Sequence, residues 1–187
     1  METLKYKMKP SLQKRLDRMD TELAGLFEAL NKYSDDDLNW KPKSDQWSVL
    51  QVMVHLMKAE AGSLAYVEKK LSSGHSHISK AGILAGGRKY IMNGLLHYPF
   101  KIKAPQGLGT ESLPDRSSFW DLVKQWKKQR EDLRTYLASL PIEALSKEIY
   151  KHPVVGRMSI NGMLSFFEGH FQRHRKQINQ VLQNYRY

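Results

Sequence analysis

Two histidines near the C-terminus, in the stretch FFEGHFQRHRKQI, have the type and spacing of metal ligands. His170 and His174 are four residues apart, and residues with this spacing on a helix share one face, with Cβ atoms about 6 Å apart. Two imidazoles placed in this way can bind one metal ion, as in helical zinc motifs. No glutamate follows the first histidine, so the pattern lacks the base of the metalloproteases that use His-Glu-x-x-His. The alternative is an incidental pair, because helix packing alone also produces this spacing.

A third histidine, His55, lies on the expected inward face of an earlier helix. Buried neutral histidines need partners for their ring nitrogens, and three inward histidines on two helices can share a divalent metal ion. His55, His170 and His174 would leave coordination positions open for water or substrate, as in catalytic metal sites. The competing interpretation makes them ordinary core or surface residues.

Four segments with helical periodicity must position these side chains, because each has apolar residues at steps of three and four. We expect helices from Leu12 to Leu30, from Ser48 to about Ser72, and from Ser118 to Leu140, and a fourth that starts at Ser159. The acidic run at 34–37 looks like a loop or a single capped turn. The expected inward residues of the second and fourth helices are Val52, His55, Leu56, Ala59, Tyr66, Met163, Phe167, His170, His174, Ile178 and Val181.

The start of the second helix carries two local signals. Ser48 and Gln51 have the spacing of a capping box. Trp47, before the cap, can pack on Val52 as a hydrophobic staple. The other tryptophans, Trp40, Trp120 and Trp126, are expected in core or staple positions, with one of the four free to line a pocket.

Residues 74–116 form a long connector that is rich in glycine and proline, with space for one short helix. A connection of this length indicates a functional loop or a crossover between distant elements. Four amphipathic helices with a long middle connection predict an all-α protein, a four-helix bundle with a crossover between its second and third helices, as a single domain over residues 1–187. No alternation strong enough for a sheet is visible. The remaining histidines, His75, His77, His97 and His152, are expected in loops.

Composition and charge exclude some classes of function and make others unlikely. The 187 residues include no cysteine, which removes disulfides, thiolate metal ligands and a cysteine nucleophile. The formal net charge is +11, but lysine and arginine are spread along the chain, so we expect a solvated surface and consider nucleic-acid binding unlikely. The N-terminus lacks the apolar core of a signal peptide, and no stretch has the length of a membrane span. A cytoplasmic protein with no membrane association is expected.

Two motifs resemble one known family. WSVLQVMVHLMKAE at 47–60 and GRMSINGMLSFFEGHFQRHRKQI at 156–178 are similar to the second-helix and last-helix signatures of the DinB/YfiT-like metalloenzymes. The resemblance covers most of the chain, and it implies a bundle of up-down-down-up topology, often a homodimer. It also implies that His55, His170 and His174 bind a divalent metal ion, for which we expect zinc or nickel.

Several relatives in that family transfer low-molecular-weight thiols. The resemblance therefore implies that the protein transfers such a thiol to a small electrophilic substrate, with the thiol held at the metal as a thiolate. Two alternatives stay open: a metal-dependent hydrolase, and a non-catalytic bundle that binds a metal or another ligand. The sequence offers no clear general base, because Glu60 and Glu168 are candidates only by their proximity to the histidines in the sequence. Catalytic residues and thiol-binding residues are not assigned.

Overall fold

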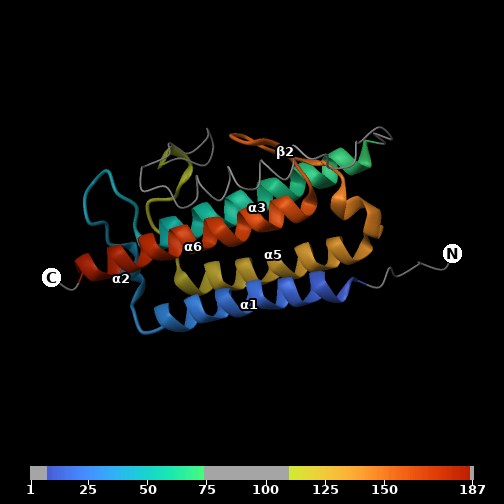
Figure 1. Cartoon of the computed structure of the whole chain (residues 1–187). Helices are drawn as coiled ribbons and strands as arrows, with labels where there is room; N and C mark the ends of the chain where they lie inside the picture. The colour runs from blue at the N-terminus through green and yellow to red at the C-terminus, as the bar shows by residue number, and fades with distance from the viewer. Residues whose placement is uncertain (1–7, 74–109, 186–187) are drawn as a thin grey trace.

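The computed structural model describes residues 8–73 and 110–185, and within them four long helices form the body of the protein (Figure 1). The elements are, in order, α1 (Pro10–Leu30), α2 (Asp35–Asn39), α3 (Val49–Ser72), η1 (Thr110–Ser112), α5 (Phe119–Ser139), η2 (Ile142–Ser146), β1 (Tyr150–His152), β2 (Gly156–Met158) and α6 (Ile160–Tyr185). The expected all-α class is confirmed. Residues 74–109 lie outside the described residues. They make up most of the connector and include His75, His77 and His97, which were expected in loops.

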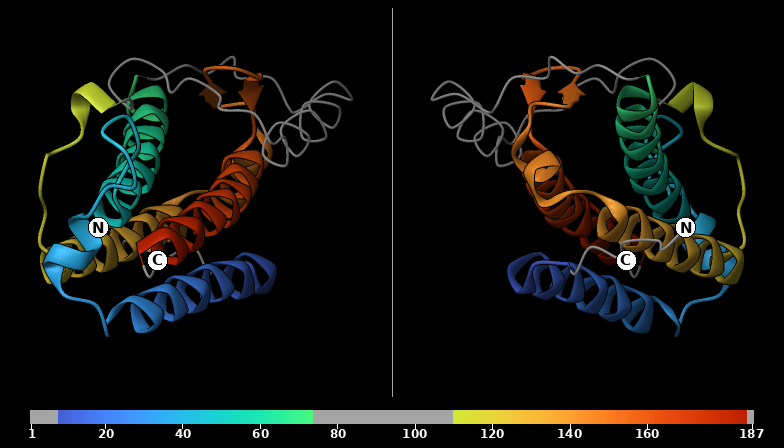
Figure 2. Two further views of the ribbon diagram at one scale, coloured as in Figure 1. Left: turned by 90° about the vertical axis from the view of Figure 1, so that its left-hand side faces the viewer. Right: turned by 90° about the vertical axis from the view of Figure 1, so that its right-hand side faces the viewer.

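The four long helices have the up-down-down-up arrangement that the resemblance implied. In Figure 1, α1 and α6 run in one direction, and α3 and α5 run in the other. Helix α3 packs against both α6 and α5, and α5 packs against α1; the end-on views of Figure 2 show the same neighbours. α3 and α5 are therefore parallel to each other, and both are antiparallel to α1 and α6.

Side-chain caps mark the first residues of α2, α3 and α6. Ser48 and Gln51 form the predicted capping box: Gln51 N donates to Ser48 Oγ, and Ser48 N donates to Gln51 Oε1, each at 3.2 Å. The acidic run expected as a capped turn is the short helix α2, capped by Ser34. Ser159 caps the last helix, because its Oγ accepts from Gly162 N at 3.1 Å. These caps place His55 and the later histidine pair on helices with defined ends.

The core consists of the inward stripes of all four long helices. Trp126 is fully buried, and the rings of Phe27 and Phe171 meet it edge-on. Two predicted core positions are wrong. Tyr66 is 36% exposed, because Ser63, Leu64 and Val67 form the buried face of α3 at that level, and Trp120 is 62% exposed.

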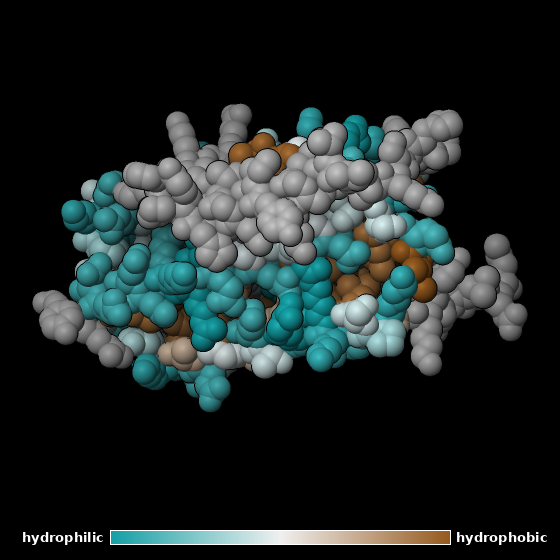
Figure 3. All heavy atoms as spheres, in the orientation of Figure 1, coloured by the Kyte–Doolittle hydropathy of each residue, from teal (hydrophilic) through white to brown (hydrophobic). Residues whose placement is uncertain are grey.

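Trp120 is exposed because of its place on the helical wheel. The inward stripe of α5 runs through Phe119, Leu122 and Trp126, so the residue that directly follows Phe119 points away from the core. Figure 3 shows that hydrophilic side chains cover most of the described part of one face, in agreement with the expected solvated surface. Among the described helices, none is long and apolar enough to cross a membrane.

A short hairpin between α5 and α6 corrects the expectation that His152 lies in a loop. β1 and β2 pair antiparallel, with Tyr150 opposite Met158 and His152 opposite Gly156. Gly156 has a φ of +83°, a conformation that favours glycine. Strands of three residues are too short to show alternation in the sequence. The hairpin contacts α3 and α6, so it lies over the helix pair that carries the three histidines.

Candidate metal centre

Three histidines converge between α3 and α6. His170 Nε2 lies 3.2 Å from His55 Nε2 and 3.0 Å from His174 Nε2. Together the three side chains can offer ligand nitrogens that all lie within 4.8 Å of one another. The three residues singled out in the sequence are therefore brought to one point by the fold.

The distances from His170 Nε2 to the other two Nε2 atoms fit a shared metal ion. Ligand nitrogens bind zinc at about 2.0–2.1 Å, and near-tetrahedral or octahedral angles then place two such nitrogens about 3 Å apart. Three neutral imidazoles are also a suitable donor set for zinc, nickel or a similar transition metal. Without a cation, two of these nitrogens can form a hydrogen bond only where one of them carries a proton. The residues present thus fit a divalent ion.

Burial keeps the imidazoles of His170 and His174 in their neutral form. His55 and His174 are 5% and 8% exposed, whereas His170 keeps more exposed surface. Burial, with the nearby His174 and His55, lowers the pKa of His170 well below its ordinary value. Burial and the neighbouring His55 lower the pKa of His174 to about 3, against a hydrogen bond with Gln177 that raises it. At neutral pH these two rings have lone pairs for a metal.

Aromatic rings enclose the histidines on two sides. The ring of Trp47 lies 4.9 Å from that of His55, and it stacks on His174 with an interplanar angle of 18°. Trp47 also packs against the core cluster that contains Val52, so it contributes to the core as well as to the site. On the other side, Phe166 stacks on His170, with ring centroids 4.9 Å apart. These rings surround the site with apolar surface.

Known proteins resemble this chain over most of its length. A sequence profile of the DinB superfamily matches residues 15–178, a range that includes all three histidines. The chain belongs to the DinB superfamily. It is similar to the uncharacterized protein YuaE of Bacillus subtilis (strain 168), with 26% identity over 157 residues, 83% of this chain and 89% of that protein. No solved structure matches the chain significantly.

The two candidate bases of this DinB-superfamily protein are both held in ion pairs. Glu60 is buried and accepts from Arg130 Nε at 2.8 Å and Nη2 at 2.7 Å, and from Trp126 Nε1 at 3.1 Å. Glu168 accepts from Arg15 and Arg18 of α1. Burial raises the pKa of Glu168, but its hydrogen bonds and ion pairs with the two arginines outweigh this effect and lower it. Both carboxylates thus join helices to one another.

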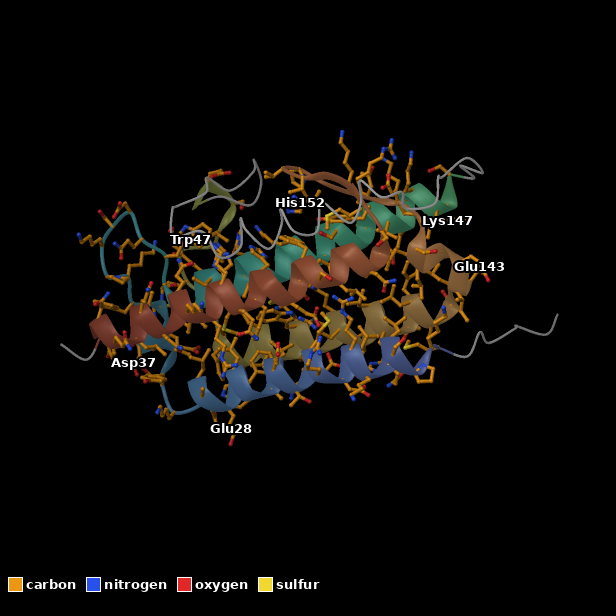
Figure 4. All side chains as sticks on the ribbon, viewed as in Figure 1. Glu28, Asp37, Trp47, Glu143, Lys147 and His152 are labelled. Atoms are coloured by element: carbon orange, nitrogen blue, oxygen red, sulfur yellow. The ribbon has the colours of Figure 1, made fainter. Side chains whose placement is uncertain are left out.

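His152 is a site neighbour that sequence reasoning placed in a loop. It lies on β1, is 8% exposed, and packs edge-on against Phe166, with ring centroids 4.6 Å apart. Its Nδ1 accepts from the backbone N–H groups of Val154 and Val155 at 3.2 and 3.4 Å, which leaves the hydrogen on Nε2. Burial lowers its pKa to about 4. Figure 4 shows Trp47 and His152 on the side of the α3–α6 pair away from α1.

The signal that identifies His152 in the sequence is weak. Tyr150 and His152 are two residues apart before a turn with Gly156, which is the spacing of two side chains on one face of a strand. The neighbouring proline, Pro153, instead suggested a loop.

Proposed function

We propose that this DinB-superfamily protein binds one divalent metal ion, zinc or nickel, through Nε2 of His55, His170 and His174. The observation that carries the proposal is the convergence of three Nε2 atoms: His170 Nε2 lies 3.2 Å from His55 Nε2 and 3.0 Å from His174 Nε2. Family membership supports it, since the matched range spans all three residues. Burial of the ring nitrogens supports it further, because buried polar atoms need partners.

We further propose that the bound ion serves thiol transfer. A divalent ion with three imidazole ligands and an open position lowers the pKa of a thiol or of a water molecule. The chain has no cysteine, so a thiol must come from a small molecule. A thiol has a pKa near 8.5 and needs little help to ionise, whereas water needs far more.

The ion pairs of Glu60 and Glu168 favour a thiol over water as the nucleophile. Glu60 and Glu168 are occupied by arginines, so neither is placed to take a proton from a nucleophile. The role of the chain is then to hold three neutral imidazoles and to enclose the site with Trp47 and Phe166. A small electrophile is the proposed second substrate, and hydrolysis is the less favoured reaction.

The metal is tested first, by mass spectrometry of untagged protein. We expect about one zinc or nickel ion per chain, lost in His55→Ala and in the double variant His170→Ala/His174→Ala. His152→Gln is a matched control, because it removes another buried histidine from the neighbourhood and leaves the three ligands intact. Metal content that is the same in the wild type and the ligand variants would refute the site.

The activity is tested with a panel of small thiols and electrophiles on the metal-loaded protein. Thiol consumption that depends on the metal and on His55 would support transfer. Full metal occupancy without turnover would favour the second candidate, a non-catalytic bundle that binds a metal or another ligand, which the ion pairs of Glu60 and Glu168 also suit. Release of product from an ester or amide without thiol would favour the hydrolase.

The remaining expectations belong to the same proposal. We propose a single domain that works in the cytoplasm as a homodimer and does not bind nucleic acid. Light scattering tests the dimer, and cell fractionation tests the location. Binding to DNA or RNA that persists at 0.15 M salt would contradict the last point, because binding by charge alone weakens steeply with salt.

A further inference from the structure

Gln177 contacts the edge of His174 that faces away from the other two histidines. It lies three residues after His174 on α6, and its Oε1 is 2.8 Å from His174 Nδ1. A carbonyl oxygen can only accept, so the hydrogen of the neutral ring must lie on Nδ1. Nε2 then carries the lone pair.

The other side of the same ring fits this assignment. His174 Nε2 lies 3.0 Å from His170 Nε2, at the point where the three rings converge. If the amide of Gln177 were turned around, its NH₂ group would donate to Nδ1, and the hydrogen would move to Nε2. That hydrogen would then fill the place of a metal ion, so only the arrangement with Oε1 toward Nδ1 leaves three nitrogens able to bind one.

Besides the other two histidines, Trp47 and Gln177 contact the ring of His174. Trp47 stacks on its face at an interplanar angle of 18°, and Gln177 binds its edge. Metal-binding histidines commonly donate their second ring N–H to such a partner, which fixes the tautomer and the orientation of the ring. Unlike a carboxylate partner, Gln177 is neutral and adds no negative charge to the site.

We infer that Gln177 is a positioning residue of this centre: it fixes His174 in the tautomer whose Nε2 can bind the metal, and its neutrality keeps the centre electron-poor. This inference rests on the proposed function. A neutral partner suits the activation of a thiol, because a carboxylate would donate charge through the imidazole and weaken the effect of the ion on the thiol pKa.

Three variants separate this role from a merely structural one. Gln177→Met keeps the length of the side chain and removes the acceptor. Gln177→Glu keeps an acceptor and adds a charge. Gln180→Met is the matched control, because Gln180 is an exposed glutamine on the same helix. Circular dichroism checks that each variant folds.

The first readout needs no metal. Long-range ¹H–¹⁵N correlation spectra of the metal-free protein report which nitrogen of His174 carries the hydrogen. We expect Nδ1–H in the wild type, in Gln177→Glu and in Gln180→Met, and a mixture or Nε2–H in Gln177→Met. An unchanged Nδ1–H tautomer in Gln177→Met would overturn the inference.

The second readout is zinc affinity, measured in competition with a chromophoric chelator. Loss of such a partner typically costs 10–100-fold in metal affinity, so Gln177→Met should bind zinc about 10–100-fold more weakly. Gln177→Glu should bind at least as tightly as the wild type, and Gln180→Met should not change. Equal affinity in Gln177→Met and the wild type would also overturn the inference. A wild type that binds neither zinc nor nickel would refute the proposed function, while the tautomer would still decide whether Gln177 controls His174.

Discussion

His55 Nε2 lies 3.2 Å from His170 Nε2, although the two residues are 115 positions apart in the chain. One belongs to α3 and the other to α6, which run antiparallel and pack against each other. A metal ion shared by these residues would link the two helices. Because the unfolded chain does not hold the three histidines together, binding would stabilise the folded protein.

The first prediction concerns thermal stability. At a free zinc concentration about 100-fold above Kd, binding adds about 2.7 kcal/mol to the free energy of unfolding. For a domain of this size, that corresponds to a rise in Tm of roughly 5–10 °C, which differential scanning calorimetry can measure. His170→Ala should lose the shift, because His170 contacts both other histidines. An equal shift in this variant would indicate that zinc binds elsewhere.

The second prediction concerns the acid sensitivity of the metal-free protein. Burial holds the pKa of His152 at about 4 and that of His174 at about 3, and it lowers the pKa of His170, whereas the same residues have pKa values near 6.5 when unfolded. As the pH falls below 6.5, the unfolded state binds protons that the folded state does not, so the free energy of unfolding decreases. The stability is fully present above pH 6.5 and is lost progressively toward pH 3–4.

Urea unfolding at pH 7.5, 6 and 5 measures this loss. Each histidine that stays neutral in the folded protein should contribute a slope of up to about 1.4 kcal/mol per pH unit. His152→Gln should reduce the slope, because it removes one of the titrating groups. A free energy of unfolding that stays constant from pH 7.5 to 5 would contradict the prediction.

The third prediction concerns the buried pair of Glu60 and Arg130. The two side chains are 4% and 6% exposed and share two hydrogen bonds. Glu60→Leu leaves the buried guanidinium of Arg130 without its hydrogen-bonded carboxylate and with Asp20 3.9 Å away, so it should lower the free energy of unfolding by about 3–5 kcal/mol. The double variant Glu60→Leu/Arg130→Met should recover much of this loss. Both should still bind metal if the pair only joins α3 to α5, and loss of metal from a folded double variant would instead connect the pair to the site.

The fourth prediction uses Trp47 as a reporter. Its ring lies 4.9 Å from the ring of His55 and stacks on His174, so an open-shell ion at the three histidines should quench its fluorescence. Titration with nickel should therefore lower the emission of the wild type and have little effect on Trp47→Phe. Trp120→Phe is the control, because Trp120 is exposed on α5. Equal quenching in Trp47→Phe and the wild type would place the metal away from this ring.

The sequence predicts the positions of the long helices well, because helix formation depends on residues that are close together in the chain. The apolar stripes, the capping box of Ser48 and Gln51, and the cap at Ser159 are local signals, and the structure confirms them except for Tyr66. The shared face of His170 and His174 is local too, since it follows from the helical repeat. His55 was found on the inward stripe of its own helix by the same rule.

Only the tertiary structure decides what these residues meet. The distance from His55 to His170 depends on how α3 packs on α6, and the partners of Glu60 and Glu168 come from α5 and α1. The burial of His152 depends on a hairpin too short to have a visible period. Gln177 is near His174 in sequence. Its role, however, depends on His174 Nε2 pointing toward the other histidines, which the packing of α3 on α6 determines. The chain thus specifies the faces of its helices locally, whereas the site exists only where those faces meet.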